Sequence, residues 1–270
     1  MAVSTQACTI WAATGAHTTE RGETIVAKVR DYIPNEQIEV TVNDGRGYAY
    51  RGLTSDGGKL RMAINEKGLV VVFAMASCIP NEILATYPKF KSEKGFDILE
   101  TLTRDCASVD EALKLIPTLG EKHPIHILIG DKKTIALIEI TPKGTLSVSK
   151  TEDGTLAHTN HFVAKKNLPF NMKIAKSSET RYKRITHLLK TAKRPLTFDA
   201  NIALTKDRHD GPNNSIFRTG NTYLSSRTIS IMAMRIPKSG APEIYLTYQE
   251  NPDLEDEPWI TKRESLAFKK

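Results

Sequence analysis

The sequence contains few cysteines, few aromatic residues and no long hydrophobic run. Three of its 270 residues are cysteines, and 7% are phenylalanine, tryptophan or tyrosine. A small, odd number of cysteines does not make the disulfide framework of a small secreted domain. The longest mainly apolar run, from Gly68 to Ile79, has about twelve residues, whereas a membrane-spanning helix needs roughly 20. We therefore expect neither a disulfide scaffold nor a membrane-spanning helix.

The overall composition is that of a folded globular protein. Charged residues make up 26% of the chain, and glycine and proline, at 16 and 13 residues, are not enriched. These values do not fit a disordered, collagen-like or low-complexity sequence. A chain of 270 residues corresponds to one large domain or two small ones, and it can bury a core without disulfides or metal.

The chain has a formal charge of +7, and many of its basic residues fall in one stretch. A basic stretch can contact phosphates, steer an anionic substrate or form a solvated helix surface, and we predict the solvated surface. The sequence has neither zinc-finger spacing nor an aromatic RNA-binding pattern, so no nucleic-acid partner is predicted. The stretch comprises Lys165, Lys166, Lys173, Lys176, Arg181, Lys183, Arg184, Lys190, Lys193 and Arg194.

The residues before Cys8 resemble the end of a secretory cleavage site. Residues 1–7 contain no basic region and no apolar core, so they do not form a signal peptide as written. Thr5 and Ala7 are nevertheless small residues, three and one positions before Cys8. Two hypotheses follow: residues 1–7 are the remnant of a trimmed signal peptide of an exported or periplasmic protein, or they are a short propeptide of a cytoplasmic one.

Hydrophobic patterning predicts an α+β protein. Alternating or continuous apolar runs predict strands, and Asn65 to Gly68 predicts a hairpin turn with glycine at a positive φ. Helical spacing predicts three helices, the second of which begins at a Ser108 capping box and stops at Pro117. Strands on both sides of a helical middle favour one layered domain. The predicted strands span 9–13, 24–32, 37–42, 60–64, 69–74, 125–129, 135–140, 146–149, 228–235 and 244–248, and the helices span 96–106, 108–115 and 178–192.

Cys8 has special chemistry if the bond before it is cut. A thiol and an α-amine have reference pKa values of about 8.5 and about 7.7–8.0. The amine of an N-terminal cysteine can therefore take the thiol proton without help from a histidine. In an uncut chain, Cys8 is more simply a small buried hydrophobic residue, as most free cysteines are.

Five segments in chain order favour the nucleophile. They are Cys8-Thr9, Ala27 to Tyr32, Asn65 to Leu69, Thr159 to Phe162 and Ser177 to Arg181. In the same order, these segments resemble a processed nucleophile, a Gly-Arg/Lys-Asn-x-Asp strand, an Asn-Glu-Lys-Gly-Leu hairpin, a strand whose Thr-Asn binds the oxyanion, and the Ser-Ser-x-x-Arg beginning of a helix. A sixth segment, Asp207 to Ile216, loosely resembles an Asp-His-x-x-x-Pro-x-Ser-Ile stretch. Over nearly its whole length the chain resembles the N-terminal nucleophile (Ntn) amidohydrolases of the choloylglycine hydrolase and isopenicillin N acyltransferase group.

The resemblance implies an α+β fold, a four-layer αββα sandwich, formed by a single domain over residues 8–270 after removal of residues 1–7. It implies a linear amide C–N hydrolase that acts on a small-molecule N-acyl amide without a cofactor, and it leaves a homo-oligomer open. Three alternatives remain: an acyltransferase that passes the acyl group to an amine, a secernin-like dipeptidase, and a non-enzymatic basic ligand-binding protein of the same fold.

The resemblance also implies roles for individual residues. Cys8 would attack the amide carbonyl and hold the acyl group as a thioester, and Asp31 would orient the Cys8 amine. Asn160 would donate a hydrogen bond to the oxyanion, and Arg181 would support the nucleophile electrostatically. Lys28 would hold a substrate carboxylate or carbonyl as a point charge. Without the resemblance, Asp31 would be an ion-pair carboxylate and Asn160 a turn asparagine. Lys28 and Arg181 would be surface cations.

Two positions depart from the family pattern. Val29 replaces the usual asparagine of the strand motif, and Met75 stands where bile-salt hydrolases have a second oxyanion asparagine. We therefore expect the second oxyanion donor to be a backbone N–H, that of Ala76, with Met75 and Ala76 next to the substrate. This difference favours the acyltransferase-like branch over a bile-salt hydrolase.

The remaining candidates have simpler interpretations. His158 and His161 have a spacing that metal ligands can have, but no third ligand with convincing spacing follows, so no metal site is predicted. A papain-like pair of Cys8 with His161 stays a minor alternative. Cys78 follows an apolar strand and Cys106 ends an apolar helix, so both are predicted to be core thiols.

Overall fold

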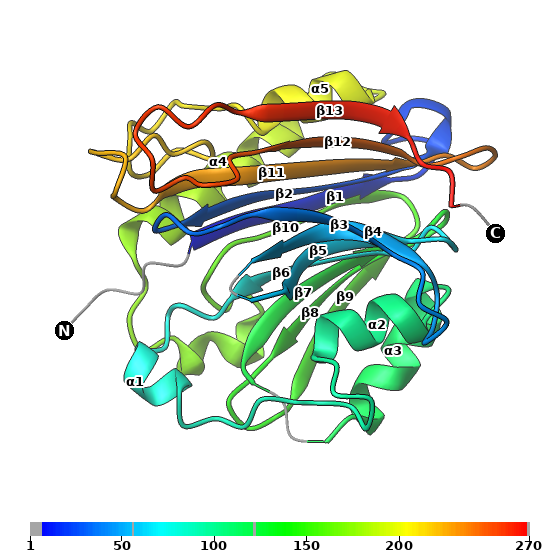
Figure 1. The fold of residues 1–270 in the computed structure, drawn as a ribbon, viewed down its shortest axis with the longest axis horizontal. Helices are drawn as coiled ribbons and strands as arrows, with labels where there is room; N and C mark the ends of the chain where they lie inside the picture. The colour runs from blue at the N-terminus through cyan, green and yellow to red at the C-terminus, as the bar shows by residue number, and fades with distance from the viewer. Residues whose placement is uncertain (1–6, 56, 121–122, 269–270) are drawn as a thin grey trace.

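The computed structural model of the protein describes residues 7–55, 57–120 and 123–268, and its strands form two antiparallel sheets (Figure 1). The predicted remnant 1–7 lies outside the described residues except for Ala7, the first residue of β1. The first sheet has the order β10 (Gly154–His158), β1 (Ala7–Thr14), β2 (Thr24–Tyr32), β11 (Arg227–Ile236), β12 (Glu243–Tyr248) and β13 (Ile260–Ser265). The second has the order β3 (Ile38–Val42), β4 (Tyr50–Ser55), β5 (Lys59–Asn65), β6 (Val70–Met75), β7 (Ile125–Gly130), β8 (Ile135–Ile140) and β9 (Leu146–Thr151).

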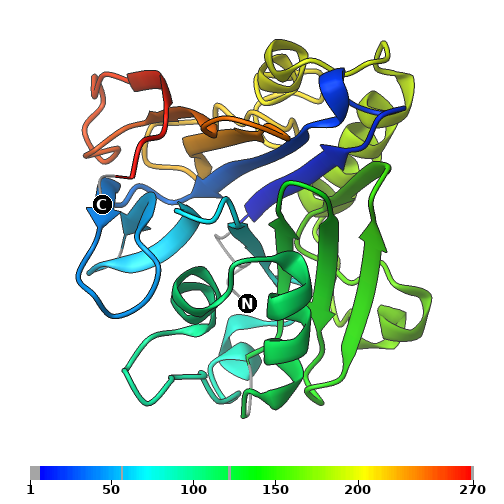
Figure 2. The same cartoon turned by 90° about the vertical axis from the view of Figure 1, so that its right-hand side faces the viewer.

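Helices cover the outer faces of both sheets, so the molecule has four layers (Figures 1 and 2). Helices α4 (Lys176–Thr191) and α5 (Phe198–Leu204) pack on the first sheet, and α2 (Ile98–Asp105) and α3 (Val109–Thr118) pack on the second. A third apolar cluster fills the space between the sheets. The short helix α1 (Asn81–Leu84) follows β6, and 3-10 turns span Glu20–Gly22 and Lys165–Phe170. The predicted αββα fold is confirmed.

Strand β1 lies inside the first sheet, and both of its faces are buried. Successive side chains of a strand point to opposite faces. Cys8 accordingly belongs to the cluster between the sheets, while Trp11 packs in the cluster beneath α4 and α5. In the ladder with β2, Ala7 lies opposite Asp31 and Cys8 lies opposite Arg30. The fold thus holds the Ala7–Cys8 bond at the beginning of an internal strand.

The predicted hairpin joins β5 to β6 and is tied to helix α2 by its asparagine. The Asn65 side chain accepts a hydrogen bond from Leu69 N at 3.0 Å and donates to the carbonyls of Thr103 and Cys106, each at 2.8 Å. Gly68 has φ +85°, a left-handed conformation that favours glycine. The Asn-Glu-Lys-Gly-Leu motif is therefore a structural element that anchors the hairpin to the helix layer.

Some elements differ from those predicted. Helix α3 continues through Pro117 to Thr118, and Leu119 N donates to Leu115 O at 3.3 Å, so the predicted stop at Pro117 is wrong. Strands β4, β10 and β13 and helix α5 were not predicted. Strand β13 lies at a sheet edge with mostly exposed, charged side chains, so it lacks the apolar alternation that identifies a strand.

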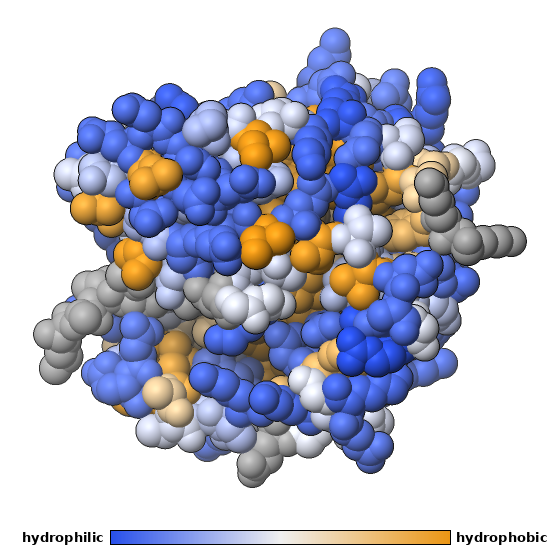
Figure 3. All heavy atoms as spheres, viewed as in Figure 1, coloured by the Kyte–Doolittle hydropathy of each residue, from blue (hydrophilic) through white to orange (hydrophobic). Residues whose placement is uncertain are grey.

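The surface is mainly hydrophilic on the face shown in Figure 3, with separate hydrophobic residues scattered over it. Such single exposed hydrophobic residues are normal for a folded chain. Within the described residues, every helix is too short or too polar to cross a membrane.

The basic stretch is largely a solvated surface, as predicted. Its lysines are exposed, and on α4 the Lys183 ammonium pairs with Glu179 at 2.8 Å. Arg184 forms an ion pair with Asp207 at 2.6 Å. Arg181 is the exception, because it is only 1% exposed and its side chain is buried in the protein.

The capping of α3 offers a test of the fold. Ser108 Oγ accepts a hydrogen bond from Glu111 N at 3.2 Å, and this bond satisfies one N–H of the first helical turn. We expect Ser108→Ala to lower the free energy of unfolding by about 1 kcal/mol in chemical denaturation. The control Ser239→Ala, at an exposed loop serine, should change it by less than about 0.5 kcal/mol. Equal losses in both variants would contradict the cap.

Candidate active site

Two side chains from distant parts of the chain hold the backbone of Cys8. Cys8 N donates to Asn160 Oδ1 at 2.9 Å, and Cys8 O accepts from Arg181 Nη1 at 2.5 Å. Arg181 Nη1 also donates to Thr9 Oγ1 at 2.9 Å, so the guanidinium bridges two consecutive residues of β1. Burial lowers the pKa of Arg181 to about 10, which leaves it charged at neutral pH. Three of the predicted catalytic residues are therefore in direct contact.

The orientation of the Asn160 amide is set by these contacts. Asn160 Oδ1 accepts from both Cys8 N and Arg181 Nη2, the latter at 2.9 Å. The amide nitrogen Nδ2 must then point the other way, and it donates to Met75 O at 3.0 Å. The donor that the resemblance assigns to the oxyanion thus faces the end of β6, where Met75 and Ala76 lie.

Ser178, at the beginning of α4, fixes the segment that carries Asn160. Its hydroxyl oxygen accepts from Asn160 N at 3.0 Å and lies 2.8 Å from His161 Nδ1. Thr159 Oγ1 donates to the Ser178 carbonyl at 2.9 Å. These contacts join the Ser-Ser-x-x-Arg and Thr-Asn segments of this chain: Ser178 positions Asn160, and Arg181, one turn later, binds it.

Asp31 is buried beside two guanidinium groups. Its Oδ1 accepts from Thr228 Oγ1 at 2.7 Å, while its Oδ2 lies 4.0 Å from Arg181 Nε and 3.9 Å from Arg218 Nη1. Among the described residues, no hydrogen-bond donor reaches Oδ2. Burial raises the pKa of Asp31, although the two arginines oppose this shift. Asp31 therefore offers an unused acceptor at the end of the ladder where β1 begins.

Lys28 lies between the sheets, wholly buried. Its Nζ donates to Arg61 O at 2.8 Å and lies 3.9 Å from the centre of the Phe73 ring. Burial lowers the pKa of Lys28 to about 7, against the opposing effect of Cys8. Lys28 itself is not among the residues that line the cavity described next, but Arg61 and Phe73 are. Its role in holding a substrate stays a prediction.

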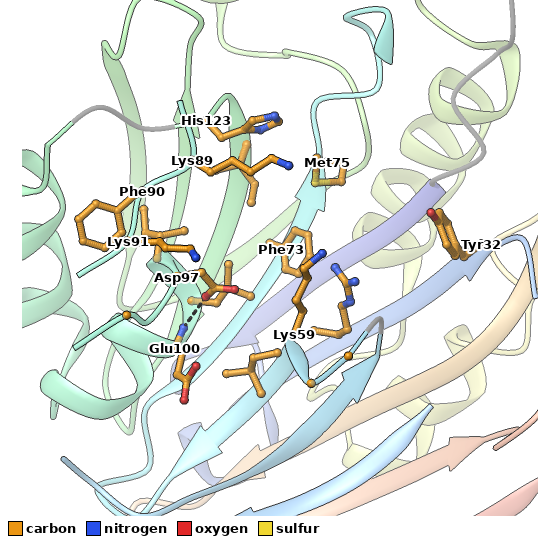
Figure 4. Close-up of a pocket in the computed structure, with 18 residues that line it drawn as sticks. Tyr32, Lys59, Phe73, Met75, Lys89, Phe90, Lys91, Asp97, Glu100 and His123 are labelled. Carbon is orange, nitrogen blue, oxygen red and sulfur yellow. Dashed lines mark hydrogen bonds between the residues drawn. The ribbon is translucent and has the colours of Figure 1, made fainter. Parts of the chain in front are cut away.

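A cavity of about 640 Å³ opens beside the cluster of Cys8, Asn160 and Arg181 (Figure 4). Phe73 and Met75 of β6 lie in its centre, and Tyr32, at the end of β2, lies across from them near the beginning of β1. Phe90 and Ile98 add further apolar wall. Met75 is the link between the cavity and the Cys8 cluster, because it lines the cavity and its carbonyl accepts from Asn160 Nδ2; Cys8 and Asn160 are not themselves lining residues.

The cavity combines these apolar walls with a basic rim. Its two acidic residues are engaged by helix α2: Asp97 Oδ1 accepts from Glu100 N at 2.9 Å, and Glu100 Oε1 accepts from Arg104 Nε at 2.9 Å. The basic residues outnumber them, so an anionic ligand is favoured there. They are Lys59, Arg61, Lys89 and Lys91, of which the three lysines are exposed.

Comparison with known proteins identifies the family. The family model of acyl-coenzyme A:6-aminopenicillanic acid acyl-transferase matches residues 18–246. The chain belongs to this family. No curated protein sequence matches it significantly.

Solved structures share the fold at low sequence identity. Penicillin V acylase from Agrobacterium tumefaciens superimposes with a TM-score of 0.54 and 12% identity, over 89% of this chain and 83% of that chain. A variant of conjugated bile acid hydrolase from Clostridium perfringens gives a TM-score of 0.52 and 13% identity, over 96% of this chain and 97% of that chain. The predicted Ntn group is confirmed, and the family places the protein among linear amide hydrolases and acyltransferases.

The other thiols and His161 have structural surroundings. Burial raises the pKa values of Cys78 and Cys106 to about 12, as expected for core thiols. His161 contacts Ser178 and packs edge-on against Tyr182, with ring centres 5.6 Å apart. Burial lowers its pKa to about 4. His161 thus belongs to the support of the Asn160 segment, and this geometry does not favour a papain-like pair with Cys8.

Sequence reasoning missed three residues of this site. Ser178 was part of a recognised motif, but its contact with Asn160 N was not anticipated. Arg218 and Thr228 approach Asp31 from the loop before β11 and from β11 itself, and no motif marked them. Only the pairing of β11 with β2, in which Thr228 lies opposite Asp31, brings them to the site.

The buried Lys28 predicts a pH dependence of stability. Its pKa is about 7 in the folded protein and 10.5 as the unperturbed value, so between these pH values the unfolded chain binds the additional proton. Its contribution to the free energy of unfolding should therefore rise from pH 7 to pH 10. We expect the wild-type protein to gain stability relative to Lys28→Met over this range, measured by urea denaturation. A difference that stays constant with pH would contradict the shifted pKa.

Proposed function

We propose that the protein hydrolyses the linear amide C–N bond of an N-acyl substrate through a thioester on Cys8, after removal of residues 1–7. The observation that carries the proposal is the convergence of Asn160 and Arg181 on the Cys8 backbone beside a cavity. Family membership supports the reaction class.

Cleavage of the Ala7–Cys8 bond would convert the Cys8 peptide nitrogen into an α-amine. The new amine keeps the acceptor Asn160 Oδ1, which already binds Cys8 N at 2.9 Å. Asp31 Oδ2 supplies a second acceptor that has no donor in the uncut chain. Asp31 lies opposite Ala7 in the β1–β2 ladder, so we propose that the new amine binds both acceptors and takes the proton of the Cys8 thiol.

In the acylation step, Cys8 Sγ attacks the amide carbonyl carbon, and the α-amine takes the thiol proton. The oxyanion of the tetrahedral intermediate accepts a hydrogen bond from Asn160 Nδ2, which exchanges Met75 O for it. When the C–N bond breaks, the leaving amine takes the proton from the α-ammonium and the acyl group remains on sulfur. Water then attacks the thioester, releases a carboxylic acid and restores the thiol.

The lining of the cavity supports a proposal for the substrate class. Its apolar walls suit an aliphatic or aromatic group, and its basic rim suits a negatively charged group at the other end of the substrate. We therefore propose an amphipathic, anionic N-acyl amide. Ala76 follows Met75 at the end of β6, and its backbone N–H is proposed as the second oxyanion donor.

Acyl transfer is the second candidate, because the matched family is named for an acyl-transferase. The two reactions diverge only when the thioester meets water or an amine. Product analysis with and without an added amine acceptor separates them: a new amide formed at the expense of the free acid indicates transfer. A non-enzymatic binding protein or a secernin-like dipeptidase would instead yield no turnover of N-acyl amides, or turnover of dipeptides only.

Substitution of the nucleophile tests the proposal directly. Cys8→Ala should abolish turnover of N-acyl amides and formation of an acyl adduct, because the attacking sulfur is absent. If the cleavage is autocatalytic, intact mass should also show that residues 1–7 remain attached. The control Cys106→Ala removes a thiol from the α2 layer and should keep both processing and turnover. An active wild-type preparation that retains residues 1–7 would refute the mechanism.

Asn160 provides a second test. Asn160→Ala should lower turnover by roughly 100-fold or more, because it removes one oxyanion donor. The circular dichroism spectrum should stay that of the wild-type protein. Asn251→Ala, at an exposed loop residue, is the control and should leave turnover unchanged. Wild-type turnover in Asn160→Ala would remove this residue from the reaction.

A further inference from the structure

A buried cluster of three ionisable side chains lies behind the candidate active site. His126 of β7 and Glu139 of β8 are opposite each other in the second sheet, and His158 comes from the end of β10 in the first sheet. Each offers one ligand atom, and these atoms all lie within 4.8 Å of one another. The three residues are between 0% and 2% exposed, and none of them takes part in the mechanism proposed above.

The hydrogen bonds of His158 require a cation shared by its ring and Glu139. His158 Nδ1 lies 2.9 Å from Thr159 O, a carbonyl that can only accept, so Nδ1 carries a proton. His158 Nε2 lies 2.9 Å from Glu139 Oε1, which also accepts. In a neutral ring this Nε2 is a lone pair that faces a carboxylate. Either a second proton lies between the two atoms, or both bind one metal ion that lies to their side.

His126 distinguishes a metal ion from a proton. Both of its ring nitrogens lack a hydrogen-bond partner among the described residues, although the side chain is wholly buried. Its ring packs against that of His158, with centres 4.1 Å apart. A wholly buried imidazole without a hydrogen-bond partner keeps at least one nitrogen lone pair free when it is neutral. A proton shared by His158 and Glu139 leaves this lone pair unused, whereas a metal ion in the cluster would bind it.

The surroundings of the cluster match the outer contacts of metal sites. Metal-binding histidines usually donate their second N–H to a carbonyl or carboxylate, as His158 does to Thr159 O. Metal-binding carboxylates are themselves held by donors. Glu139 Oε1 accepts from Val163 N at 2.7 Å, and Oε2 accepts from Asn167 Nδ2 at 2.7 Å.

We propose that His126, Glu139 and His158 bind a divalent transition-metal ion, with zinc as the best match. Two imidazoles and one carboxylate are a common zinc donor set, in which water supplies the fourth ligand. The ion would link the two sheets two residues before Asn160 and so hold the segment that carries the oxyanion donor. The proposal does not depend on the proposed amide chemistry.

Metal analysis of the full chain tests it. Protein produced in zinc-supplemented medium and then dialysed should contain about one zinc ion per chain, measured by inductively coupled plasma mass spectrometry. His126→Phe, which keeps a ring against Phe162 but removes the ligand, should contain only background zinc. His187→Gln, at an exposed residue of α4, should keep the wild-type content. Background zinc in the wild-type protein, or equal zinc in His126→Phe, would overturn the site in favour of a shared proton.

A second variant keeps the test valid if His126→Phe does not fold. Asn167→Ala leaves all three proposed ligands in place and removes the donor to Glu139 Oε2, together with the bond from the same nitrogen to Ser147 Oγ. Its zinc affinity, measured by competition with a chromophoric chelator, should fall by about 10–100-fold. A folded Asn167→Ala protein with wild-type zinc affinity would contradict the arrangement.

Discussion

The candidate active site depends on one buried cation, Arg181. A guanidinium that is 1% exposed needs partners for its donors, because an unsatisfied buried charge is very costly. Arg181 finds them in Cys8 O, Thr9 Oγ1 and Asn160 Oδ1, and the carboxylate of Asp31 lies 4.0 Å from it. Its geometry therefore connects β1, the segment after β10 and helix α4, and it aligns the predicted nucleophile with its predicted oxyanion donor.

A second layer of buried polar contacts supports this arrangement from behind. Ser178 holds Asn160 N and lies beside His161, and Glu139 holds His158 and Val163. The segment from 159 to 164 contains no helix or strand, so these contacts define its path. The fixed fork of Arg181 could not select one orientation of the Asn160 amide if this backbone were free to move.

The sequence predicted those strands, turns and helix caps that depend on residues close to one another in the chain. The apolar runs of β2 and β6, the Asn65 hairpin and the Ser108 cap follow from local patterns, and an ordered motif set indicated the family and the Cys8 cluster. Sheet pairing was not readable from one sequence. It brings Thr228 opposite Asp31 and His126 opposite Glu139, although 197 residues separate the first pair. For the same reason, the pattern His158-x-x-His161 could not reveal the residues that the structure groups with His158, since His126 and Glu139 precede it on other strands.

The unpaired oxygen of Asp31 connects the fold to the proposed removal of residues 1–7. In the uncut chain, a buried carboxylate oxygen without a donor raises the free energy of the folded protein, and the raised pKa of Asp31 has the same origin. The single N–H of the Cys8 peptide is already used by Asn160. An α-ammonium carries additional protons and a positive charge, and either would stabilise the Asp31 carboxylate. The open acceptor of Asp31, at the end of the ladder where β1 begins, is thus the structural argument for the proposed removal of residues 1–7.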